Sequence, residues 1–160
     1  MHGIGAAGER TWVSPEHTSA RRLPIRSPLV PYPDVETASR WLCQVFGFEQ
    51  RLIIGNHRQQ LGFGYGAVIV TGSNSSEPIC EQAGAPFAVM VRVEDVDAHH
   101  KRAARRGAVI LSPPASYPYG ERQYSCRDFA GHRWTFSQSI ADVAPEDWGG
   151  VAIGNRAVSE

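Results

Sequence analysis

Apolar positions along the chain form two kinds of pattern, short continuous stretches and segments with helical spacing. Both patterns recur in the same order in each half of the chain. A short apolar stretch ends in Asp-Val, a segment with helical spacing follows, and then come a glycine and further apolar stretches. Asp34 and Asp95 lie 61 residues apart, and Gly47 and Gly107 lie 60 apart. The register is therefore kept to within one residue, which indicates an internal repeat.

The segment after each of these aspartates is predicted to be a helix. Aspartate is a good N-cap because its carboxylate accepts hydrogen bonds from the free amides of the first turn. Gly47 and Gly107 suit the left-handed position that ends a helix. The apolar face of the first helix is formed by Val35, Ala38, Trp41, Leu42, Val45 and Phe46. The second helix has a thinner apolar face.

Three strands are predicted after each helix, because stretches rich in Val, Ile and aromatic residues lie between Gly, Pro and Asn breaks. Together with the apolar stretch before the helix, these strands make each half a βαβββ module. The strands are expected at residues 50–55, 60–64 and 67–71 in the first half, and at 109–112, 123–127 and 133–138 in the second.

Two such modules predict an α+β fold with curved mixed sheets around a cleft. Each helix covers one face of its own sheet, and the other face needs a different cover. Pairing of the two sheets, within the chain or across a homodimer, would enclose the cleft. The expected parts are an N-terminal arm (1–26), a domain (27–138) with modules at about 27–72 and 86–138, and a C-terminal tail (139–160).

Composition narrows the possible partners. Hydrophobic residues make up 42% and charged residues 20%, as in globular proteins. Sixteen basic and sixteen acidic residues cancel, so nucleic acid is not favoured as a partner. No apolar run is long enough to span a membrane, and the N-terminus lacks a secretory pattern. The three cysteines form no C-x-x-C motif, so we expect a cytoplasmic protein without disulfides or structural zinc. The basic run at 101–106 is expected to be a solvated helix face.

The second half contains four short motifs that are typical of one protein family. They are Val93-x-Asp95-Val96-Asp97-Ala98, Gly107-Ala108, Pro118-Tyr119-Gly120-x-Arg122 and Asp128-Phe129-Ala130-Gly131-His132-x-Trp134. This half resembles the vicinal-oxygen-chelate superfamily of glyoxalases, bleomycin-resistance proteins and extradiol dioxygenases. The first half is similar more weakly, through Tyr32-x-Asp34-Val35, Ala38, Trp41-Leu42 and Phe46-Gly47-Phe48. The resemblance covers residues 27–138 and implies this fold, which hosts several enzymatic and non-enzymatic activities.

The Asp128 turn also has a physical explanation. Asp128 can accept hydrogen bonds from amides two and three residues further on, and Gly131 can adopt a positive φ. The turn would close a hairpin between the strands of Tyr124 and Trp134. We expect its residues to be structural.

The resemblance also implies where a metal would be bound. Enzymes of the superfamily commonly hold a divalent metal on His, Gln and Glu side chains that face the cleft. The matching positions here are Ser27, Ala88, Thr135 and the neighbourhood of 68–70, and none offers a strong ligand. No two of the six histidines have a coordinating spacing on one strand face. We therefore predict no metal. The sequence also lacks the nucleotide-binding and nucleophile motifs that would indicate another cofactor or chemistry.

Without a metal, the cleft is expected to bind a small molecule. Bleomycin-resistance-like relatives sequester flat, partly aromatic drugs between subunits, so the resemblance implies a homodimer that holds a drug or metabolite. The alternative is a divergent metal-dependent lyase, isomerase or dioxygenase. A third hypothesis is a partner-binding module that uses the arm and the tail as contacts.

Strand alternation and the resemblance give the candidate ligand-binding residues. Arg92 either anchors a carboxylate or phosphate, or forms a surface ion pair with Glu94 or another acid. Tyr124 is either a stacking wall or part of the core, and Met90 either lines the cleft or packs. Arg133 and Ser137 also alternate to the cleft side. The full candidate set is Leu29, Ala88, Met90, Arg92, Tyr119, Arg122, Tyr124 and Thr135.

Overall fold

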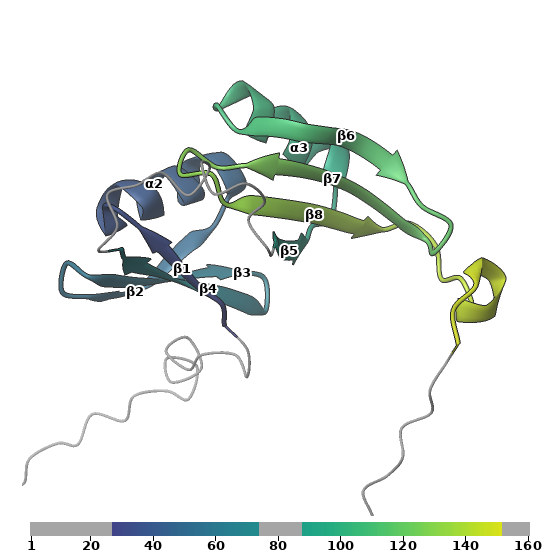
Figure 1. Cartoon of the computed structure of the whole chain (residues 1–160), viewed down its shortest axis with the longest axis horizontal. Helices are drawn as coiled ribbons and strands as arrows, with labels where there is room; N and C mark the ends of the chain where they lie inside the picture. The colour runs from purple at the N-terminus through teal and green to yellow at the C-terminus, as the bar shows by residue number, and fades with distance from the viewer. Residues whose placement is uncertain (1–26, 74–87, 152–160) are drawn as a thin grey trace, which may run out of the picture.

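The computed structural model describes residues 27–73 and 88–151, and it contains two modules that lie side by side (Figure 1). The first module comprises β1 (Leu29–Tyr32), α2 (Val35–Phe46), β2 (Glu49–Ile54), β3 (Arg58–Phe63) and β4 (Gly66–Gly72). The second comprises β5 (Ala88–Arg92), α3 (Val96–Arg105), β6 (Val109–Ser116), β7 (Glu121–Arg127) and β8 (Arg133–Ser139). A 3-10 helix, η2 (Pro145–Trp148), follows. The predicted arm and most of the segment between the modules lie outside the described residues.

Each module has one four-stranded mixed sheet, and the two sheets have the same topology. The strand orders are β1-β4-β3-β2 and β5-β8-β7-β6. The first strand of each module pairs in parallel with the last strand, and the other pairs are antiparallel. This confirms the predicted α+β fold of two βαβββ modules. Among the described residues, no helix has the length and apolar character needed to cross a membrane.

The helix ends form as the sequence predicts. The Asp34 carboxylate accepts a hydrogen bond from the Thr37 amide at 2.7 Å, and that of Asp95 accepts from the Ala98 amide at 2.9 Å. Gly47 ends α2 with a φ of 81°, a left-handed conformation that favours glycine. Local sequence alone therefore fixes where both helices begin.

Strand β6 is longer than its pattern predicts. It continues through Pro113 and Pro114 to Ser116, with a register irregularity between Ser112 and Ala115. Proline is tolerated here because β6 is an edge strand, where a missing amide donor breaks few sheet hydrogen bonds.

A single hydrophobic core joins the two modules. The ring of Phe46, at the end of α2, lies 4.9 Å from that of Phe136 and 5.4 Å from that of Trp134 (centroid distances). The Tyr32 hydroxyl on β1 donates a hydrogen bond of 2.6 Å to Asp128, in the turn before β8. The modules therefore cannot lose their packing independently.

Three side chains of the basic run, those of Lys101, Arg105 and Arg106, are exposed, as the charge pattern predicts, and Arg102 is half-buried. Two of these cations also contact the first module. Arg106 donates a hydrogen bond of 2.5 Å to the carbonyl oxygen of Gln44. The Arg102 guanidinium lies over Gly47, so close that a Cβ there would be 2.4 Å from its Nη2. Both cations thus sit at the C-terminal end of α2, where the helix dipole favours positive charge.

Candidate ligand-binding faces

Helix α2 packs on one face of the first sheet and α3 on one face of the second. We call the other face of each sheet its open face. On the first open face, Leu29 pairs with Ile69, Ile69 with Gln60, and Gln60 with Leu52, which gives one row across four strands. Together with Ser27, Ile54 and Arg58, these residues line a cavity of about 200 Å³.

The open face of the second sheet is more polar at the same level. Its row runs from Met90 through Thr135 and Ser125 to Ser112. The hydroxyls of Ser112 and Ser125 are 2.6 Å apart and hydrogen-bonded. Ala88, Met90 and Thr135, predicted from alternation, all belong to this open face, and Leu29 belongs to that of the first sheet.

Arg92 is also on the second open face, in an ion pair. Its Nη2 lies 2.9 Å from Oε1 of Glu121, and the second oxygen of that carboxylate accepts a hydrogen bond from Ser137. The acid is Glu121 rather than Glu94. Ser137 also accepts a hydrogen bond of 3.1 Å from Gln123. The guanidinium of Arg92 therefore already has a carboxylate partner.

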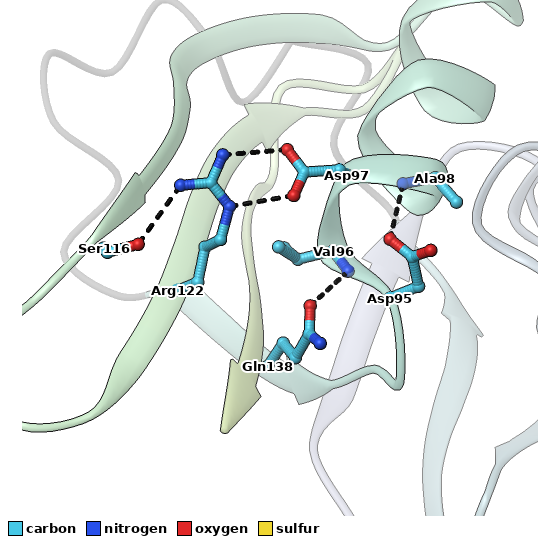
Figure 2. A network of polar contacts seen from close by, with 7 residues as sticks. All are labelled: Asp95, Val96, Asp97, Ala98, Ser116, Arg122 and Gln138. Carbon is cyan, nitrogen blue, oxygen red and sulfur yellow. Dashed lines mark hydrogen bonds and ion pairs between the residues drawn. The ribbon is translucent and has the colours of Figure 1, made fainter. Parts of the chain in front are cut away.

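Arg122 belongs to the opposite, helix-covered face. Figure 2 shows its guanidinium against Asp97 at the start of α3, with Nε 2.8 Å and Nη2 2.9 Å from the two carboxylate oxygens. Nη1 donates to Ser116 at 3.2 Å. These hydrogen bonds lower the pKa of Asp97 below its usual value. The pair ties α3 to β7, so Arg122 has a structural contact away from the open face.

Tyr124 is part of the core. Its hydroxyl lies 2.7 Å from Nδ1 of His99, and Nε2 of His99 lies 2.8 Å from the carbonyl oxygen of Phe46. Because a carbonyl only accepts, Nε2 carries the proton and Nδ1 accepts from Tyr124. Burial lowers the pKa of His99 to about 4. This neutral histidine therefore connects the second module, through α3 and Tyr124, to Phe46 of the first module.

Tyr119 lies in an aromatic cluster at the turn between β6 and β7. Its ring stacks on Tyr117 at 5.3 Å and meets Trp148 of η2 edge-on at 5.8 Å. Its hydroxyl donates to Gln123, on the open face, at 3.3 Å. No role is predicted from the sequence for Trp148, which lies in the expected C-terminal tail. Within APEDWGG, Pro145 at the first helical position and Gly149 directly after Trp148 are the signals of a short helix.

The tail is anchored to that turn through its backbone. The amides of Ile140 and Ala141 donate to the carbonyl oxygen of Gly120 at 2.8 and 3.2 Å. Gly120 has a φ of 80°, and a Cβ there would lie 2.2 Å from the Ala141 carbonyl oxygen. Figure 1 shows η2 at the end of the second module, far from the first. Glycine at position 120 is thus required for the tail to dock.

Residues 24–136 match the family model of the Glyoxalase/Bleomycin resistance protein/Dioxygenase superfamily. The chain belongs to this superfamily. Among solved structures it is similar to TioX from Micromonospora sp. ML1, with 33% identity, a TM-score of 0.59, and coverage of 76% of this chain and 100% of TioX.

Two further solved structures share the fold at lower identity, and one further sequence matches over a short segment. A glyoxalase/bleomycin resistance protein/dioxygenase family enzyme from Burkholderia phytofirmans is 20% identical, with a TM-score of 0.60 and coverage of 71% of this chain and 98% of that one. FosX, a fosfomycin resistance protein from Listeria monocytogenes, is 13% identical, with a TM-score of 0.57 and coverage of 72% and 92%. A 60-residue segment is 32% identical to the uncharacterized protein Mb0911c of Mycobacterium bovis. It covers 38% of this chain and about two fifths (40%) of that relative's length.

The residues present do not fit the metal that enzymes of this superfamily commonly hold. Ala88 and Thr135 occupy two of the expected ligand positions, and neither side chain is a strong metal ligand. The two positions of the first module are Ser27 and the neighbourhood of 68–70, where Ile69 lines the open-face cavity and Val68 and Val70 are buried in the core, so neither position offers a strong ligand. Within 27–73 and 88–151, no group of three or more His, Cys, Asp or Glu side chains could hold a metal ion.

A buried thiol and an inter-module hollow complete the candidate sites. Burial raises the pKa of Cys126 to about 12, which disfavours the nucleophilic thiolate. A hollow of about 1070 Å³ lies between the modules, bounded by Phe63 and Tyr65 of the β3–β4 hairpin and by Ala98 and Arg102 of α3. The β3–β4 hairpin belongs to the first module and α3 to the second, and the lining also includes Arg92, so the hollow reaches the edge of the second open face.

Proposed function

We propose that the protein binds a small organic molecule between an apolar and a polar open face, without a catalytic metal. The observation that carries this proposal is the chemistry of the second open face. Hydroxyl, amide and guanidinium groups stand there, and Thr135 occupies the position of a carboxylate ligand. Such groups recognise and orient a ligand, but they do not provide the Lewis acid of the superfamily's metalloenzymes.

A second copy of the chain is the proposed cover for the open faces. Leu29 is 57% exposed on the first open face and Met90 is 63% exposed on the second. Ile54, which lines the same cavity as Leu29, is also exposed. Exposed apolar side chains that lie together, as Leu29 and Ile54 do, usually mark a surface that another molecule covers. In a homodimer, the first sheet of one copy would face the second sheet of the other and enclose a cleft with two unlike walls.

The aromatic cluster of Tyr117, Tyr119 and Trp148 would form one end of that cleft. The Tyr119 hydroxyl reaches the open face through Gln123, which places the cluster beside the polar wall. Aromatic side chains suit a flat ligand, because their faces stack on it at little entropic cost. The proposed ligand is therefore a flat, partly aromatic compound, whether drug or metabolite.

Three measurements on tag-free protein test this proposal. Elemental analysis should find no transition metal near one equivalent per chain. Light scattering coupled to size exclusion should give the mass of a dimer. The neutral fluorophore N-phenyl-1-naphthylamine should bind saturably, at about one molecule per cleft. One firmly held metal ion per chain would instead favour the divergent metal-dependent enzyme, and a monomer that binds no aromatic probe would contradict the proposal.

A further inference from the structure

Strands β5, β7 and β8 carry four arginines, and their pairing differs. Arg92 and Arg122 each have a carboxylate partner. Arg127 and Arg133 are opposite each other in the pairing of β7 with β8. Among the described residues, neither of these two takes part in any of the four ion pairs or in a side-chain hydrogen bond.

Both unpaired arginines are on the open face. They are two residues from Ser125 and Thr135 along their strands, and side chains alternate between faces with a period of two. Residues directly opposite in an antiparallel pair have Cβ atoms about 5 Å apart, and like charges there repel. The fold thus places two cations together without a counterion from the described chain.

An oxyanion would satisfy this arrangement. Each guanidinium presents planar N–H donors that match the oxygens of a carboxylate, sulfonate or phosphate. The hydroxyls of Ser125 and Thr135 form the next row on the same face. Ala88, beside Arg133 on β5, has a short side chain that leaves room above the pair.

The first sheet has no such pair. Its matching positions are Ala67 and Gly62, which are also paired across strands. The Arg51 side chain lies over Gly62, but its Nη2 donates a hydrogen bond of 2.9 Å to the carbonyl oxygen of Gly64. Arg58, which lines the cavity of the first open face, also takes part in none of the ion pairs of the described residues, but it stands alone there. Two unpartnered guanidiniums opposite each other are therefore particular to the polar wall.

We infer that Arg127 and Arg133 bind the acidic group of the ligand, which is an organic anion with an apolar, partly aromatic body. This inference rests on the proposed function and names the ligand class of that site. The body would lie against the apolar row of Leu29, Ile69 and Leu52, and the oxyanion would lie between the two guanidiniums.

Two related fluorophores test the inference. 8-Anilino-1-naphthalenesulfonate has the ring system of N-phenyl-1-naphthylamine plus one sulfonate. The wild-type protein should bind the sulfonate compound about tenfold or more tightly than the neutral one, as expected for charge-assisted hydrogen bonds. Arg127→Gln and Arg133→Gln should each remove most of that preference, and the double variant all of it. Binding of the neutral compound should not change.

Arg105→Gln is the matched control, because it removes the same charge from an exposed helix position whose Nε donates to its own helix. It should keep the preference for the sulfonate. If the neutral probe binds but the preference is absent or survives in the double variant, the inference is wrong and the proposed function stands. A double variant with an altered oligomeric mass would also overturn it, because the arginines would then pair with the second copy. Failure of both probes to bind would contradict the proposed function itself.

Discussion

The helix-covered faces of the two sheets pack into one common core, whereas their open faces differ in polarity. Because the two modules are repeats, each strand of the first module corresponds to one strand of the second, and the cross-strand partners correspond as well. The row of Leu29, Ile69, Gln60 and Leu52 matches the row of Met90, Thr135, Ser125 and Ser112. One row is mostly apolar, and the other is mostly hydroxyl-bearing.

This difference indicates which face is constrained by folding. On the covered faces both modules contribute to a single core, so their side chains must fit one another. The open faces carry no such requirement, and one backbone can support an apolar wall in one module and a polar wall in the other. A cleft built from both walls would select a ligand that has an apolar side and a polar side.

The largest expected effect comes from breaking the shared core. Phe46→Ala should lower the free energy of unfolding by about 4 kcal/mol, because it removes a buried ring that packs on Trp134 and Phe136. Denaturant unfolding followed by tryptophan fluorescence should still show one transition, since both modules lose packing together. Tyr65→Ala, at a fully exposed position, should change stability by less than about 0.5 kcal/mol. Two separate transitions would contradict a common core.

The next effect depends on pH and on the link between the modules. His99 has a pKa of about 4 in the folded protein, well below the value near 6.5 of an unfolded chain. Between these values the unfolded state binds more protons, so stability falls as the pH falls from about 6.5 to about 4. We expect this histidine to contribute up to about 3 kcal/mol of that loss. Unfolding of wild type and His99→Gln at several pH values would measure it. An equal slope in both proteins would contradict the assignment.

The covered faces could be predicted from sequence because local signals and burial agree there. Asp34, Asp95 and Gly47 cap helices through contacts within a few residues, and the apolar spacing marks the buried side. The Asp128 turn was predicted nearly correctly. Its carboxylate accepts from the amides of Ala130 and His132, two and four residues on, and Gly131 has a φ of 95°. The hydrogen bond from the His132 amide, in place of one from three residues on, depends on the backbone conformation of the turn, which the residue types alone do not specify.

The open faces could be predicted only in part, because alternation gives the side of a strand but not the partner of a charge. It placed Met90 and Thr135 correctly. It could not show that Arg92 and Arg122 meet Glu121 and Asp97, which lie 29 and 25 residues away. The resemblance also suggested Tyr124 as a possible wall, but the register puts its ring on the covered side. Such pairings depend on tertiary distances that no local pattern contains.

A smaller effect should distinguish the two sides of one strand. Ile53 and Ile54 are adjacent on β2 and point to opposite sides. Ile53 and Gln59 line a hollow on the side of the sheet that α2 covers, and Ile54 lines the cavity of the open face. Both are exposed, at 56% and 43%, so lysine at either position should change stability by less than about 1 kcal/mol. Ile54→Lys should weaken binding of N-phenyl-1-naphthylamine at least tenfold, or about 1.4 kcal/mol, and Ile53→Lys should not. Equal effects would show that the open face is not the binding wall.

The smallest expected effect concerns the ion pair of Arg122 with Asp97. The Asp97 side chain is about half exposed (47%), so water and salt screen the pair despite its bidentate geometry. Arg122→Gln and Asp97→Asn should each cost less than about 1 kcal/mol, with a coupling energy of about 0.5 kcal/mol in a double-mutant cycle. Neither should alter the binding of either fluorophore, because the pair faces α3. Arg122→Gln and Arg133→Gln remove the same charge from opposite faces of one sheet. If Arg122→Gln alone weakened binding of the sulfonate probe, the polar wall would extend to the covered face, and the contrast between the two faces would no longer locate the site.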